Sequence, residues 1–186
     1  MLLDDLKNGG RVLVVYPRKN LNDVEAVEGM ESRMETNPMH TVEGALPGWQ
    51  AKFGDQVASI TSDNTTEEKV ATLDAFADGR INVLVTTTVV EVGLNLPGLY
   101  RIVIVDPTRY GLATLHQLRG RVARKGGEGH CELLCDDKLK AEQQDRLDFS
   151  VRPRTGLRLP PATWSCVALV IWAAAAIASP APTSCS

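Results

Sequence analysis

Cysteine is scarce in this chain, which argues against a small protein held together by disulfides. Four cysteines in 186 residues are too few and too scattered for a disulfide scaffold. Cys131 and Cys135 flank an apolar run typical of a buried strand, where a thiol usually packs as a small hydrophobe. His130 precedes Cys131, but no second pair of ligands stands at a suitable spacing, so we expect no metal site. The first residues lack a basic segment followed by an apolar one, so we expect no signal peptide.

Two glycine-rich nucleotide-binding loops are missing as well. No Gly-x-x-x-x-Gly-Lys-[Ser/Thr] loop, which would cradle phosphates, occurs in the sequence. No Gly-x-Gly-x-x-Gly follows the first expected strand, which excludes a dinucleotide-binding domain. The aliphatic run at 102–105 ends in Asp106, as a magnesium-binding strand does. Without the phosphate loop, we expect Asp106-Pro107 to be the exit of an ordinary strand.

Basic residues are fewer than acidic residues in this chain, except in one segment. The formal net charge is -3, and because all three basic residues after Ser150 lie in a stretch without acid, the first 150 residues carry 23 acidic and 17 basic groups. Such an acidic body is a poor general binder of nucleic acid, since that affinity comes mainly from neutralising phosphates. Five basic residues with no acid among them nevertheless lie between Asp106 and Glu128: Arg109, Arg119, Arg121, Arg124 and Lys125. We expect one electropositive face on an acidic body.

Strand and helix patterns alternate along the chain. Aliphatic runs bounded by glycine, proline or aspartate predict strands at 11–16, 57–60, 82–86, 101–106 and 130–135. Helices are predicted at about 21–34, 41–53, 65–77 and 113–124. The third opens with a capping box of Thr65 and Glu68 and has an apolar face of Val70, Leu73 and Phe76. The alternation predicts a parallel α/β sheet with helices on both faces, and 186 residues leave room for one such domain and a tail.

The run Leu115–Arg124 is the most informative segment. Residues three and four apart share a helix face, so we expect Gln117, Arg121 and Arg124 to lie together on one helix. Guanidinium groups are permanently charged and present rigid forks of donors that suit phosphate oxygens. Gly120 clears space for a ligand or a neighbouring domain. A solvated basic helix end is the alternative interpretation.

The run Val83–Pro97 is the second informative segment. It begins as a buried strand and ends in three threonines, where hydroxyls and free amides can meet a phosphate. Gly93 and Pro97 then break it into a loop. Ligands of open parallel sheets gather beyond the carboxyl ends of the strands, which is where these threonines are expected.

Together the two runs resemble motifs V and VI of superfamily-2 helicases, in particular RecG and the transcription-repair coupling factor. The resemblance covers roughly residues 10–148. It implies a RecA-like fold and the role of a second motor lobe, which closes over ATP and Mg²⁺ held mainly by a first lobe that this chain does not contain. By itself the chain is then expected to show no ATPase activity.

The resemblance also implies roles for individual residues. Arg124 would be the arginine finger, with Arg121 beside it on the γ-phosphate. The same nucleotide-facing cluster would include Gly93, Asn95, Gln117 and Gly120. Thr87 and Thr88 would contact a phosphate of the DNA strand. The implied partners are branched or duplex DNA in repair and recombination, and a first helicase lobe supplied in trans or by the intact parent protein.

Three departures limit what the resemblance implies. Asn95 stands where relatives usually have aspartate, and its amide brings no charge to pair with an arginine. Ala123 replaces a frequent glycine, which a helix tolerates. The helical hairpin and glycine-rich translocation segment of RecG-like proteins are not found after Phe149. We therefore expect no duplex translocation by this chain as it stands.

Residues 149–186 form an irregular or helical apolar tail of unusual composition. No charge occurs from Ala162 to Ser186, and Trp164–Ala178 is apolar except for Ser165, which is shorter than the roughly 20 residues of a membrane span. Three interpretations stay open: an out-of-frame or truncated gene end, a disordered or loosely docked tail, and a membrane anchor. We expect a cytoplasmic, nucleoid-associated protein, with membrane attachment through the tail as the alternative. The rival functions are a non-catalytic module that docks on a helicase or on nucleic acid, and a tail-anchored membrane protein.

Overall fold

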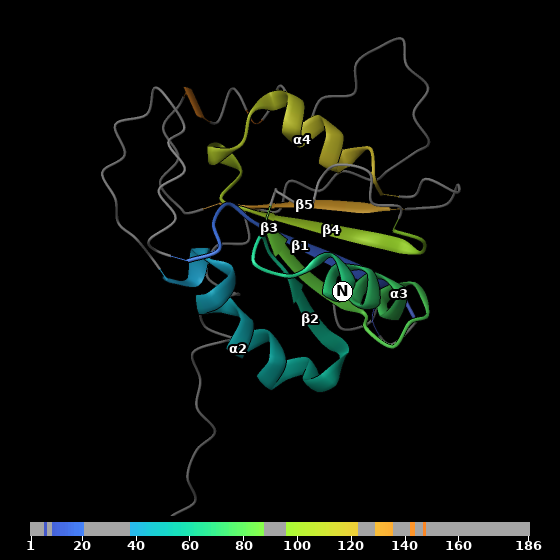
Figure 1. Cartoon of the computed structure of the whole chain (residues 1–186). Helices are drawn as coiled ribbons and strands as arrows, with labels where there is room; N and C mark the ends of the chain where they lie inside the picture. Colours follow the sequence, from blue (N-terminus) through green and yellow to red (C-terminus); the bar gives the residue numbers. More distant parts are fainter. Residues whose placement is uncertain are drawn as a thin grey trace, which may run out of the picture.

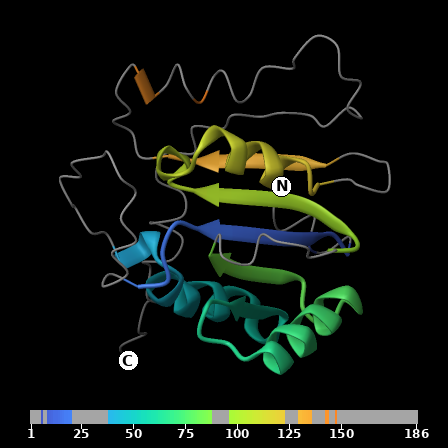
Figure 2. The same cartoon turned by 45° about the horizontal axis from the view of Figure 1, so that its top comes forward.

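A five-stranded parallel sheet forms the centre of the molecule (Figure 1). The computed structural model describes residues 6, 9–20, 38–87, 96–122, 129–135, 142, 143 and 147. The strands are β1 (Arg11–Tyr16), β2 (Val57–Ile60), β3 (Val83–Thr87), β4 (Leu99–Val105) and β5 (His130–Leu134). They lie in the order β2-β3-β1-β4-β5, and every neighbouring pair is parallel. All carboxyl ends therefore meet at one edge, on the side of the arrowheads in Figure 2.

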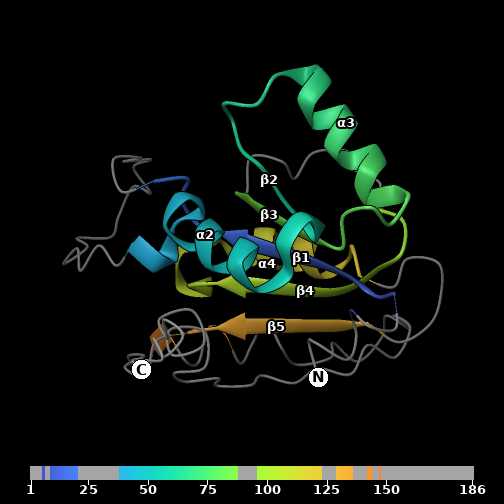
Figure 3. The same ribbon diagram turned by 90° about the horizontal axis from the view of Figure 1, so that it is seen from below.

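Helices cover both faces of the sheet, as predicted. The described helices are α2 (Val42–Phe53), α3 (Thr66–Ala77) and α4 (Leu112–Arg119), with short 3-10 turns η1 (Pro38–His40), η2 (Gly54–Gln56) and η4 (Pro107–Arg109). Phe76 of α3 and Leu115 of α4 pack on one face, in a cluster with Ile102 and Ile104. Val42 and Ala45 of α2 pack on the other face. Figure 2 shows α4 in front of the sheet, and Figure 3 shows the opposite side with α2 in front.

The strand predictions are confirmed, because continuous aliphatic runs have few alternatives in a chain of this length. The first predicted strand matches β1, which is buried along five of its six residues. Cys131 is buried in β5, as expected of a thiol that packs as a small hydrophobe. β4 ends at Val105, and Asp106 begins a turn with a left-handed φ of 49°, so Asp106-Pro107 is a strand exit.

Two helix predictions are wrong in part. The arginine helix was expected over 113–124, but α4 ends at Arg119. Gly120 caps it, and the amides of Arg121 and Val122 bond to carbonyls three residues back, which tightens the chain into a turn. Gln117 and Arg121 are therefore not on one continuous helix. Val70, expected on the apolar face of α3, is 51% exposed, because only the second half of that helix reaches the core.

Other expectations lie outside the described residues. These are the helix at 21–34 and the whole of the tail at 149–186. In the part of the chain that the structure describes, no helix is long and apolar enough to cross a membrane.

Candidate nucleotide and nucleic-acid site

The solvent-facing side of α4 carries part of the predicted nucleotide cluster. Leu115 and Leu118 are buried, and this spacing turns the opposite side of the helix outward. His116, Gln117 and Gly120 are exposed on that side. The structure thus brings Gln117 and Gly120 together on one accessible surface at the end of the helix.

Gly120 has no structural need to be glycine in the described part of the chain. Its backbone angles, φ -66° and ψ -1°, are open to any L-residue. A Cβ placed there would meet only the carbonyl oxygens of Gln117 and His116, both at 3.6 Å, which is ordinary van der Waals distance. The space above Gly120 is open, so a side chain would point to where another molecule can approach.

The arginines next to Gly120 are less accessible than the sequence suggested. Arg119 and Arg121 are both half-buried, and both already interact with other residues of the chain. Burial lowers the pKa of Arg119, and Cys131 opposes that shift. Val122, the next residue, is buried and anchors the turn in the core. Arg124, the predicted arginine finger, lies outside the described residues.

The threonines at the end of β3 are buried. Thr86 is 4% exposed and Thr87 is 6% exposed, and the Thr86 hydroxyl donates to the Thr87 carbonyl at 3.0 Å. Thr87 lies at the carboxyl edge of the sheet, as predicted, and little of its surface is exposed. Thr88, Gly93 and Asn95 lie outside the described residues.

Arg11 holds the far end of the segment that begins with these threonines, and sequence reasoning missed it. One Nη of Arg11 donates to the Pro97 carbonyl, and its guanidinium lies 5.9 Å from the centre of the Phe76 ring. Gly98 has a φ of +74°, and a Cβ there would lie 2.7 Å from the guanidinium. The Arg11 side chain thus occupies space that a side chain at position 98 would fill. No sequence pattern signalled it, because Arg11 and Pro97 are 86 residues apart.

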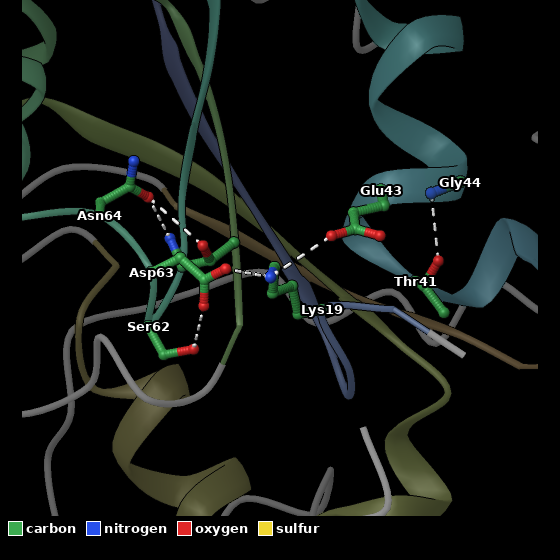
Figure 4. A network of polar contacts seen from close by, with 8 residues as sticks. Lys19, Thr41, Glu43, Gly44, Ser62, Asp63 and Asn64 are labelled. Carbon is green, nitrogen blue, oxygen red and sulfur yellow. Dashed lines mark hydrogen bonds and ion pairs between the residues drawn. The ribbon is translucent and has the colours of Figure 1, made fainter. Parts of the chain in front are cut away.

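A second polar group missed from the sequence joins three segments at the carboxyl edge (Figure 4). Lys19, just after β1, forms ion pairs with Asp63 from the β2–α3 loop and with Glu43 from the first turn of α2, the latter at 3.5 Å. The hydrogen bond from Lys19 lowers the pKa of Asp63, and the same bond raises the pKa of Lys19. The backbone agrees with this arrangement, since the Lys19 carbonyl accepts from the Glu43 amide at 2.9 Å. These ion pairs therefore connect the end of β1, the β2–α3 loop and the start of α2 at the carboxyl edge.

The chemistry of the described residues favours an anion over a metal. Within the described ranges there is no group of three or more His, Cys, Asp or Glu that could hold a metal ion. The donors near Gly120 are an amide and guanidinium groups, which suit phosphate oxygens. This donor set fits the phosphates of a bound nucleotide.

Comparison with known protein families identifies the domain. The family model of the helicase conserved C-terminal domain matches residues 1–126. The chain belongs to this helicase C-terminal domain family. The ATP-dependent DNA helicase RecG of Thermotoga maritima is 35% identical over 159 residues, covering 83% of this chain and 18% of that protein. The chain thus spans about a fifth of the length of the curated relatives it matches.

Solved structures agree with the family. RecG bound to a three-way DNA junction superposes with a TM-score of 0.58 and 32% identity, covering 78% of this chain and 17% of that one. The C-terminal domain of the DEAD-box protein Dbp5 gives a TM-score of 0.51 at 20% identity, covering 80% of this chain and 74% of that domain, and shows the fold alone. The predicted RecA-like fold and the predicted likeness to RecG are confirmed.

Proposed function

We propose that this chain acts as the second motor lobe of a RecG-like ATP-dependent DNA helicase. The observation that supports this most directly is the exposed end of α4, where Gln117 and the open space above Gly120 lie beside Arg121. A second lobe needs such a surface, because it must approach a nucleotide that another lobe holds. In this proposal Arg121 and Arg124 supply positive charge to the triphosphate, and Gln117 orients it.

ATP and Mg²⁺ belong to this proposal as ligands shared with a first lobe. When bound, the metal would neutralise charge between the phosphates. The residues of this chain would bind the outer phosphate oxygens and exclude water from that side. Gly93 and Asn95 would complete the nucleotide contacts, and Thr87 and Thr88 would contact the DNA strand.

The test uses phosphate release. The purified chain alone should release no phosphate from ATP, with or without DNA. Mixed with a RecG fragment that lacks its second lobe, it should restore DNA-stimulated release. Arg124→Ala should then lower the rate a thousandfold or more, the magnitude associated with arginine fingers.

The matched control is Arg80→Ala, which removes an exposed arginine of the α3–β3 loop. It should leave the restored rate unchanged. Robust turnover by the chain alone that survives Arg124→Ala would contradict the proposal.

A further inference from the structure

An aspartate in a strained conformation holds an arginine at the exit of β4. Asp106 is the only non-glycine residue with positive φ in the described part of the chain, at 49°. Its amide continues the sheet by donating to the Leu134 carbonyl at 2.9 Å. Its carboxylate accepts from the Thr108 hydroxyl at 2.7 Å and from Nε of Arg109 at 2.5 Å. A positive φ at a side-chain-bearing residue costs of order 1 kcal/mol and persists where the surroundings enforce it.

The mode of attachment leaves the outer half of the Arg109 guanidinium available. Asp106 engages Nε, the atom nearest the side-chain stem. Among the described residues, neither Nη group of Arg109 makes a hydrogen bond, although the side chain is only 31% exposed. Its four Nη–H donors, which lie in a fixed plane, therefore have no acceptor among the residues that the structure describes. This edge of a guanidinium matches the oxygens of a phosphate.

The position in the sheet points to the same ligand. η4 follows the carboxyl end of β4, at the edge where parallel sheets bind ligands. The next strand is β1, whose exit carries Arg18, and beyond it lies β3, which ends at Thr87. Neighbouring strands lie about 4.8 Å apart, so the end of β4, which leads into Arg109, is about 10 Å along the edge from the end of β3.

A local ion pair that merely closes the turn is the simpler interpretation of Asp106 and Arg109. Arg80 and Asp78 provide a comparison, with an Nη–Oδ2 distance of 3.3 Å and side chains 68% and 66% exposed. That pair is solvated and engages a terminal nitrogen. The β4 exit differs because the aspartate is strained, the pair is much less exposed, and the bond engages Nε, not a terminal nitrogen.

We propose that Arg109, positioned by Asp106, binds a phosphate oxygen at the carboxyl edge of the sheet, as a contact separate from the arginines that follow α4. The inference rests on the proposed function, since it assumes that phosphates reach this lobe. The phosphate belongs either to a nucleic-acid strand or to a nucleotide. Asp106 fixes the direction of the guanidinium and does not touch the ligand.

Salt dependence of binding tests the proposal. Binding of a fluorescently labelled DNA duplex to the purified chain is measured between about 50 and 200 mM salt, for the wild type and Arg109→Gln. The loss of one phosphate contact should reduce the slope of log K against log salt by about 0.9. The matched control is Arg80→Gln, which changes the net charge equally and should leave the slope unchanged. A fluorescent ATP analogue is titrated in parallel.

Each outcome decides a separate point. A lower DNA slope supports a strand phosphate, and weaker binding of the ATP analogue with an unchanged DNA slope supports a nucleotide phosphate. Equal behaviour of Arg109→Gln and the wild type toward both probes overturns the inference while leaving the proposed function standing. A wild type that binds neither probe also overturns the inference, whereas the proposed function is decided separately by the restored phosphate release.

Asp106→Asn gives a second readout. Asparagine tolerates the left-handed conformation and keeps an oxygen that can accept from Nε. The Asp106→Asn variant should therefore keep the thermal unfolding midpoint of the wild type. It should also keep most of the slope of log K against log salt for DNA binding. Asp106→Ala should reduce the slope as Arg109→Gln does. A slope unchanged in Asp106→Ala would show that the aspartate does not position Arg109.

Discussion

Two glycines in helical segments serve different purposes. Gly44, in the first turn of α2, faces the Pro38 carbonyl, whose carbon would lie 2.6 Å from an added Cβ, with the oxygen nearer still. Gly120, at the end of α4, has only ordinary contacts around the same added atom. The first glycine is needed for packing within the chain. No described residue requires the second to be glycine, which is consistent with a surface that another molecule approaches.

This contrast gives a prediction for the two alanine variants. Gly44→Ala should lower the free energy of unfolding by about 2 kcal/mol or more, because backbone must move to relieve the overlap. Gly120→Ala should leave it unchanged or raise it by about 0.5 kcal/mol, since alanine favours helical backbone. Urea unfolding of both variants measures the difference. Gly120→Ala should still impair the restored phosphate release, and a fully active variant would argue against a partner above this residue.

The capping box of α3 shows how far local sequence can specify an element. The Thr65 side chain accepts from the Glu68 amide at 3.2 Å, and the Glu68 carboxylate accepts from the Thr65 amide at 2.9 Å. Both bonds join residues three apart, so the spacing predicts them correctly. The end of α4 behaves differently, because the extended arginine helix was expected from periodicity that the turn after Gly120 interrupts.

Removal of the cap should weaken α3 measurably. Thr65→Ala should lower the free energy of unfolding by about 1 kcal/mol, because the Glu68 amide loses its acceptor. Thr66→Ala is the matched control, since Thr66 is the exposed first residue of the helix and not its cap. Chemical unfolding of both variants provides the measurement. Equal losses would show that the cap contributes nothing specific.

The stability of the molecule as a whole should depend on pH through a buried phenol. Tyr16, the last residue of β1, accepts a hydrogen bond from the Trp49 indole of α2 at 2.9 Å. Burial raises the pKa of Tyr16 from 10.0 to about 12, and the Trp49 hydrogen bond partly offsets this. The folded-state pKa is thus above the unfolded value. Its contribution to stability is fully present below pH 10.0 and is lost as the pH rises toward 12.

The Tyr16→Phe variant isolates this effect. Between about pH 9 and 12 the wild type should lose of order 2 kcal/mol more than the variant, since one pKa unit corresponds to about 1.4 kcal/mol. Urea unfolding across this range measures both proteins, and the ionisation of lysines cancels in the comparison. Parallel pH curves for the two proteins would contradict the assignment of the high pKa to the Tyr16 phenol.

Much of the fold and part of the site follow from the sequence, because they depend on nearby residues. Five aliphatic runs predict the five strands, and the alternation with helices predicts a parallel sheet covered on both faces. The family likeness to RecG follows from the motifs at the end of β3 and in α4. Gln117 and Gly120 lie exposed together at the helix end, consistent with their predicted place in one cluster.

The remaining features required the three-dimensional arrangement. The strand order places β1 between β3 and β4, and this decides which loops meet at the carboxyl edge. Thr87 is buried by the packing of the sheet. The hydrogen bond from Arg11 to the Pro97 carbonyl and the ion pair of Lys19 with Asp63 both join residues that are far apart in the chain. Asp106, which bonds to Arg109, has a left-handed φ of 49°, and its amide bonds to the Leu134 carbonyl of β5. Propensity and spacing act over a few residues, whereas packing between distant segments determines which donors face inward and which face a ligand.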